Sequence, residues 1–63
     1  MNIYFGWHAK SLFDTGDIPP SSVGVFKSDY GSWVYWFTDG WAYDSGSAET
    51  EKEALRKAKN NFR

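Results

Sequence analysis

Residues 33–43 read W-V-Y-W-F-T-D-G-W-A-Y, and six of these eleven positions are aromatic. The Asp39-Gly40 pair predicts a two-residue type I′ turn, because such a turn needs positive φ angles at both positions. The residues on either side then form a β-hairpin with strands over 32–38 and 41–45. A small soluble protein seldom leaves so much apolar surface in water without a partner. The hairpin therefore indicates both a sheet and a candidate binding surface.

Two more strands are predicted on the N-terminal side of this hairpin. Residues 2–8 alternate between two sets of side chains, and residues 22–28 lead into a short loop at Asp29-Tyr30-Gly31. Residues 9–21 form a connection, with room for one helical turn over residues 9–13. The connection ends at two prolines, which donate no backbone hydrogen bond and break regular structure.

A helix is predicted over about residues 51–62. Thr50 and Glu53 have the spacing of a capping box, in which each side chain accepts from the other residue's backbone N–H. The apolar stripe of this helix has helical spacing and consists of Ala54, Leu55, Ala58 and Phe62. We therefore expect one α+β domain over residues 1–63. Its antiparallel sheet has three or four strands, with one C-terminal helix packed on one face (β-β-β-α or β-β-β-β-α).

The turns also predict how side chains divide between the two faces of the sheet. We expect Thr38 to pair with Trp41, and Ser28 to pair with Ser32 across the other loop. One face then carries Val23, Val25, Lys27, Trp33, Tyr35, Phe37, Ala42 and Asp44, and the other carries Gly24, Phe26, Val34, Trp36, Thr38, Trp41 and Tyr43. We expect the helix on the valine face, since β-branched residues pack well on a pleated surface. Trp36 is expected to cover Gly24.

The second face is the candidate binding surface, because one four-residue helix stripe cannot cover both apolar faces. Its predicted binding residues are Phe26, Trp36, Trp41 and Tyr43. The alternative is that side chains from the N-terminal segment fold over this face, so that every aromatic residue belongs to the core. Those covering side chains would be Ile3, Phe5, Trp7, Leu12 and Phe13.

Composition argues against catalysis and against bound cofactors or metals. The chain has no cysteine and a single histidine, which leaves no thiolate site and no credible zinc site. A glycine-rich phosphate loop is also missing, so we predict neither an enzyme nor a cofactor. The N-terminus lacks the basic start and apolar stretch of a signal peptide, and no apolar run could span a bilayer. We expect no membrane contact and a cytoplasmic location.

A nucleic-acid-binding domain is the alternative function. Residues 31–58 resemble the plant AP2-type and integrase arm-binding domains, in which three strands precede a helix, and the tail is similar to the last helix of double-stranded-RNA-binding domains. This resemblance implies a sheet that reads nucleic acid. Residues 1–46, however, contain two lysines and five aspartates, a net charge of −3, whereas residues 47–63 carry +2. An acidic sheet repels phosphate, and cations near a helix C-terminus already complement its dipole.

The sequence also resembles small uncharacterised proteins of phages and bacteria. The shared pattern is a tryptophan-rich hairpin with a D-G turn, followed by S-G-x-A-x-T-x-x-E-A at the start of a terminal helix. Here it covers about residues 31–62, with Asp39-Gly40 as the turn and Ser45 to Ala54 as the second part. The resemblance leaves both a phage and a bacterial origin open, and if a phage encodes the chain, the expected location is the host cytoplasm. Our leading hypothesis is a small non-catalytic protein-binding module that acts through its aromatic sheet face or as a homodimer.

Overall fold

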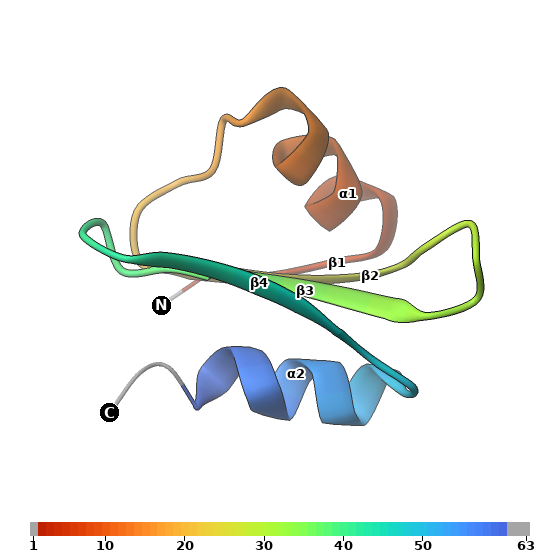
Figure 1. Ribbon diagram of the computed structural model, residues 1–63. Coiled ribbons are helices and arrows are strands. Elements are labelled where there is room, and N and C mark those ends of the chain that lie inside the picture. Colours follow the sequence, from red (N-terminus) through yellow and green to blue (C-terminus); the bar gives the residue numbers. More distant parts are fainter. Residues whose placement is uncertain (1, 61–63) are drawn as a thin grey trace.

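The computed structural model describes residues 2–60, which form a four-stranded sheet between two helices (Figure 1). Along the chain the elements are β1 (Asn2–Phe5), α1 (Gly6–Thr15), β2 (Ser22–Lys27), β3 (Trp33–Thr38), β4 (Tyr43–Ala48) and α2 (Glu51–Lys59). The strands are ordered β1-β2-β3-β4 in space. Helix α1 lies on one face of the sheet and α2 on the other (Figure 1). The α+β class is confirmed, but with three layers instead of two.

The N-terminal part of the chain corrects the predicted topology. Residues 2–8 are not one strand: the strand ends at Phe5, and α1 begins at Gly6, whose φ of +62° redirects the backbone. The connection over residues 9–21 thus contains most of a helix. Strand β1 pairs with β2 in parallel, so the sheet is mixed instead of antiparallel. A parallel neighbour requires a crossover connection, and α1 supplies it.

The pairing of β2 with β3 is the one that the sequence predicts. Gly24 pairs with Trp36 and Val25 with Tyr35. The backbone N–H of Ser28 donates to the Ser32 carbonyl at 2.7 Å, and Gly31 has a φ of +89°. The short loop and its glycine therefore set this register as expected.

The pairing of β3 with β4 differs from the prediction by two residues. Thr38 pairs with Tyr43 instead of Trp41, and β4 covers Tyr43–Ala48 instead of residues 41–45. The predicted two-residue type I′ turn is wrong, because Asp39 does not have a positive φ. The loop covers residues 39–42, and within it the Asp39 carboxylate accepts from the backbone N–H groups of Trp41 and Ala42. Since side chains alternate with a period of two, a shift of two residues leaves the face assignment of Tyr43 and Asp44 unchanged.

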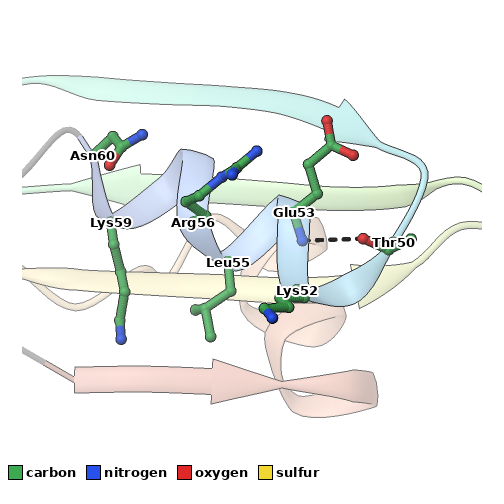
Figure 2. Close-up of a pocket in the computed structure, with 7 residues that line it drawn as sticks. All are labelled: Thr50, Lys52, Glu53, Leu55, Arg56, Lys59 and Asn60. Atoms are coloured by element: carbon green, nitrogen blue, oxygen red, sulfur yellow. Dashed lines mark hydrogen bonds between the residues drawn. The ribbon is translucent and has the colours of Figure 1, made fainter.

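Helix α2 packs on the valine face, as predicted. Its small residues Ala54 and Ala58 are fully buried against side chains of β2 and β3, and Leu55 packs against the same clusters. The Thr50 hydroxyl caps the helix by accepting from the Glu53 backbone N–H at 3.1 Å. The other predicted bond of the capping box, from the Thr50 backbone N–H to the Glu53 carboxylate, is wrong. That carboxylate lies 3.5 Å from the Lys57 ammonium and points away from Thr50 (Figure 2). The predicted stripe residue Phe62 lies outside the described residues.

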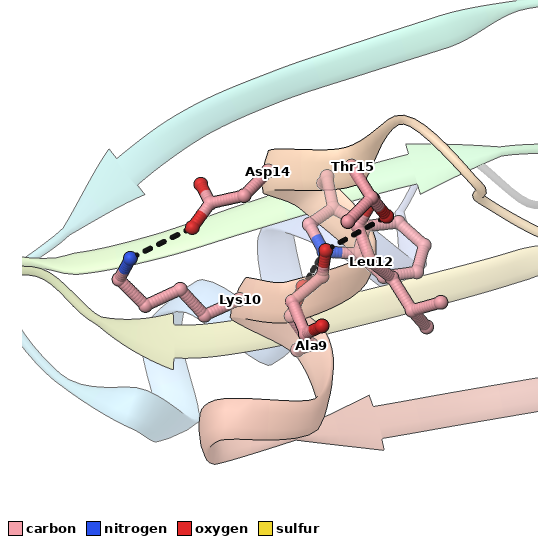
Figure 3. Close-up of polar contacts among 7 residues, drawn as sticks. Ala9, Lys10, Leu12, Asp14 and Thr15 are labelled. Carbon is pink, nitrogen blue, oxygen red and sulfur yellow. Dashed lines mark hydrogen bonds and ion pairs between the residues drawn. The ribbon is translucent and has the colours of Figure 1, made fainter.

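Helix α1 packs on the opposite face through Ala9, which is fully buried against Phe26 and Trp36. The Trp36 indole N–H donates to the Ala9 carbonyl at 3.1 Å, which ties β3 to α1. As predicted, the Trp36 ring covers Gly24, where a Cβ atom would overlap the indole. On α1 itself, the Lys10 ammonium donates to the Asp14 carboxylate at 2.8 Å (Figure 3).

Candidate functional site

Two of the four predicted binding residues are not exposed. Trp36 is fully buried and Phe26 is 5% exposed, because α1 covers their part of the sheet. The Phe26 ring packs against Phe13, with ring centroids 5.6 Å apart. A patch that combines these two residues with Trp41 and Tyr43 therefore does not form.

The alternative in which the N-terminal segment covers the second face is confirmed for part of that segment. Leu12 and Phe13 pack against the cluster around Trp36. Ile3, Phe5 and Trp7, by contrast, are among the exposed large apolar residues. Ile3 and Phe5 belong to β1, where alternation with Tyr4 turns them to the other face, and in α1 only the residues on the inner side of the helix reach the sheet.

Trp41 and Tyr43 remain exposed, as the sequence predicts. Trp41 is 98% exposed in the loop between β3 and β4, and Tyr43, the first residue of β4, is 53% exposed. Tyr43 pairs with Thr38 and lies on the face where α1 packs on β1, β2 and Trp36 of β3. We call residues 39–43 the hairpin tip.

Hydrogen bonds within the hairpin tip hold its backbone in one conformation. The Asp39 carboxylate accepts from the N–H groups of Trp41 and Ala42, both at 2.8 Å, and the Thr38 hydroxyl accepts from the Gly40 N–H at 3.1 Å. Gly40 has a φ of +95°, which favours glycine. The tip thus presents its tryptophan from an ordered loop, so little loop ordering is left to occur on binding.

The hairpin tip is also acidic. Hydrogen bonds from the backbone N–H groups of Ala42 and Trp41 lower the pKa of the Asp39 carboxyl group, which therefore stays ionised near neutral pH. Burial raises the pKa of the Tyr43 hydroxyl; the nearby Asp44 carboxylate raises it further, whereas a hydrogen bond with Ser45 lowers it. A neutral tyrosine and a tryptophan beside two carboxylates suit a partner surface with apolar and basic groups.

A second surface, along α2, is one that the sequence does not indicate. An open hollow of about 480 Å³ there is lined by Thr50, Lys52, Glu53, Leu55, Arg56, Lys59 and Asn60 (Figure 2). Three of these residues are cations and one is an anion, so the hollow is basic. The signal was present in the +2 charge of residues 47–63, which a favourable interaction with the helix dipole alone could explain.

In the part of the chain that the structure describes, the histidine packs among aromatic rings and metal-ligating side chains are not gathered. His8 lies against two rings, with centroids 4.9 Å from Tyr4 and 5.7 Å from Trp7. Residues 2–60 contain no group of three or more histidine, aspartate or glutamate side chains that could hold a metal ion. Within the same residues, neither helix is long and apolar enough to cross a membrane.

Comparison with known proteins found no matching family model, no similar curated protein and no similar solved structure.

Proposed function

We propose that this chain is a small non-catalytic protein-binding module whose hairpin tip contacts the partner. The observation that supports the proposal most is the contrast between Trp36 and Trp41. The first is fully buried, whereas the second is 98% exposed on a loop held by three hydrogen bonds to side-chain oxygens. Tryptophan is the typical anchor of protein interfaces, and truncating such an anchor costs about 2 kcal/mol or more of binding free energy.

The partner in this proposal is a protein, a second copy of this chain included. The carboxylates of Asp39, in the hairpin tip, and of Asp44, which follows it in β4, disfavour nucleic acid there because they repel phosphate. No cofactor or metal takes part in the proposed contact. The proposed setting is the cytoplasm, which is that of the host if a phage encodes the chain.

Trp41→Ala tests the proposal against a matched control, Tyr30→Ala. Tyr30 is 96% exposed in the loop between β2 and β3, so both changes truncate an exposed aromatic ring. We expect parent and variants to melt at the same temperature. Parent and Tyr30→Ala should retain self-association in sedimentation, or a protein captured from a lysate, and Trp41→Ala should lose it.

Three results would contradict the proposal. The parent protein is strictly monomeric and captures nothing, or the Trp41→Ala variant binds as the parent does. The third is tight binding of labelled single- or double-stranded DNA at low salt, which would favour a nucleic-acid-binding domain.

A further inference from the structure

The α2 side of β1 is an apolar strip that neither helix covers fully. Tyr4 packs toward Trp36 on the α1 side, so the alternation of side chains places Ile3 and Phe5 on the α2 side. They lie level with Val23 and Val25 of β2, which α2 buries. Ile3 itself is 37% exposed and Phe5 is 47% exposed.

Helix α2 borders this strip with one apolar and two basic side chains. Leu55 packs on the clusters that contain Val23 and Val25, which are the β2 neighbours of Ile3 and Phe5. Figure 2 shows Leu55 and Lys59 extending from α2 toward the β1 side of the sheet, and Lys52 lies along the same side of the helix and lines one hollow with them. Both lysines are exposed. We call Ile3, Phe5, Leu55, Lys52 and Lys59 the β1 ledge.

The backbone at the β1 ledge offers hydrogen-bonding groups as well. Strand β1 is at one edge of the sheet, and the N–H of Asn2 donates to the Ser21 carbonyl on the β2 side. Because backbone groups alternate in direction along a strand, the N–H and C=O of Ile3 and the N–H of Phe5 point away from β2. An edge strand of this kind is a template for another extended chain.

We infer that the β1 ledge binds an extended, acidic segment of a partner protein, which adds to the sheet beside β1. Alternate apolar side chains of that segment cover Ile3, Phe5 and Leu55, while its carboxylates pair with Lys52 and Lys59. The two lysines disfavour a second copy placed edge to edge, because a two-fold axis at β1 would bring like charges together. This ledge is distinct from the hairpin tip, so the proposal for one surface can be refuted without refuting the proposal for the other.

The test uses a synthetic peptide of about eight residues that alternates glutamate and valine, long enough to extend past the four residues of β1. A peptide that alternates lysine and valine is the control ligand. Each is titrated into isotope-labelled full-length protein at low salt, with amide NMR signals as the readout. We expect only the acidic peptide to bind saturably, with the largest shifts at Ile3 and Phe5 and weaker binding as salt is added.

Two variants assign the binding to the ledge. Lys52→Glu reverses a ledge charge in the first turn of α2, where the helix dipole favours an acidic side chain. This variant should lower the affinity for the acidic peptide about fivefold. Lys10→Glu makes the same charge change on α1 and should bind the peptide as the parent does. Ile3→Thr keeps the β-branched shape but removes apolar contact, so it should also weaken binding.

The inference would be overturned by any of four results. The first is that the acidic peptide does not bind, and the second is that Lys52→Glu and Lys10→Glu weaken its binding equally. The third is that the chemical shift changes map to Trp41 and Tyr43, and the fourth is that sedimentation shows a dimer in which the Ile3 and Phe5 amides are protected. Labelled duplex DNA that binds in a Lys52-dependent manner, while the peptide does not, would assign the ledge to nucleic acid instead.

Discussion

The two helices are held to the sheet in different ways. Helix α2 has a side-chain cap at Thr50, acidic residues in its first turn, basic residues in its last turn, and two alanines that let it approach the sheet closely. Helix α1 lacks a side-chain cap, an acidic residue in its first turn and a basic residue in its last turn. It depends instead on distant partners, above all the Trp36 indole that bonds to the Ala9 carbonyl. Local signals thus stabilise α2, whereas tertiary contacts stabilise α1.

The difference also explains where the sheet remains exposed. Helix α1 packs on β1, β2 and the Trp36 ring of β3, and α2 packs on β2, β3 and β4 of the other face. The uncovered strands are therefore at opposite edges: β1 on the α2 side, with Ile3 and Phe5, and β4 on the α1 side, with Tyr43. Both proposed interaction surfaces lie at these uncovered edges.

The largest expected effect is that of Trp36→Ala, which removes the main anchor of α1. Truncating a fully buried tryptophan costs about 3–5 kcal/mol, which is comparable to the stability that a core of this size supplies. We expect the variant to lose its cooperative thermal transition by circular dichroism. Trp41→Ala is the control, because its side chain is exposed. A Trp36→Ala protein that melts like the parent would mean that α1 does not depend on this residue.

Two glycine substitutions compare the two faces directly. A Cβ atom at Gly24 would overlap the fully buried Trp36 ring, so Gly24→Ala should cost about 1–3 kcal/mol. A Cβ atom at Gly46 would lie 2.6 Å from the Tyr35 hydroxyl oxygen on the α2 side, at the free end of a half-buried ring that can shift. Urea denaturation should therefore show a smaller loss for Gly46→Ala. Equal losses would mean that the α2 side is packed as rigidly as the α1 side.

Thr50→Ala tests the local contribution to α2. The change removes the acceptor for the Glu53 N–H and should lower the free energy of unfolding by about 0.5–2 kcal/mol. The thermal midpoint measures the effect, with Glu49→Ala, one residue before the cap, as the control. If the midpoint of Thr50→Ala stays at the parent value, the cap does not stabilise α2 and the contrast with α1 is lost.

The same contrast decides what could be predicted from the sequence. The α2 cap, the apolar stripe and the register of β2 with β3 all follow from residues close together in the chain. Helix α1 does carry a signal, since Ala9, Leu12 and Phe13 have helical spacing, but the alternation of Ile3, Phe5 and Trp7 also fits a strand. What selects the helix is the distant Trp36 ring.

The candidate site was predictable only in part, for a related reason. The exposure of Trp41 and Tyr43 follows from their place beside a turn at a sheet end, and the adjacent Asp39-Gly40 pair indicates that turn. The burial of Phe26 and Trp36 depends on which segment crosses over them, and that segment is the unpredicted α1. The sequence does not reveal the β1 ledge, because its alternation predicts a strand that continues through His8, and the parallel pairing of β1 with β2 leaves little trace in local sequence.

The smallest expected effect concerns the hairpin tip, which neither helix covers. Because backbone N–H groups hold the pKa of Asp39 below its ordinary value of 3.8, the carboxylate stabilises the folded tip fully above that pH. This contribution is lost as the pH falls through the lower pKa of the folded state. Asp39→Asn keeps an acceptor oxygen but does not titrate. We therefore expect the Trp41 and Ala42 amide signals of the parent to move below pH 4, and those of Asp39→Asn to stay in place. Identical titrations in the two proteins would mean that another group controls the tip.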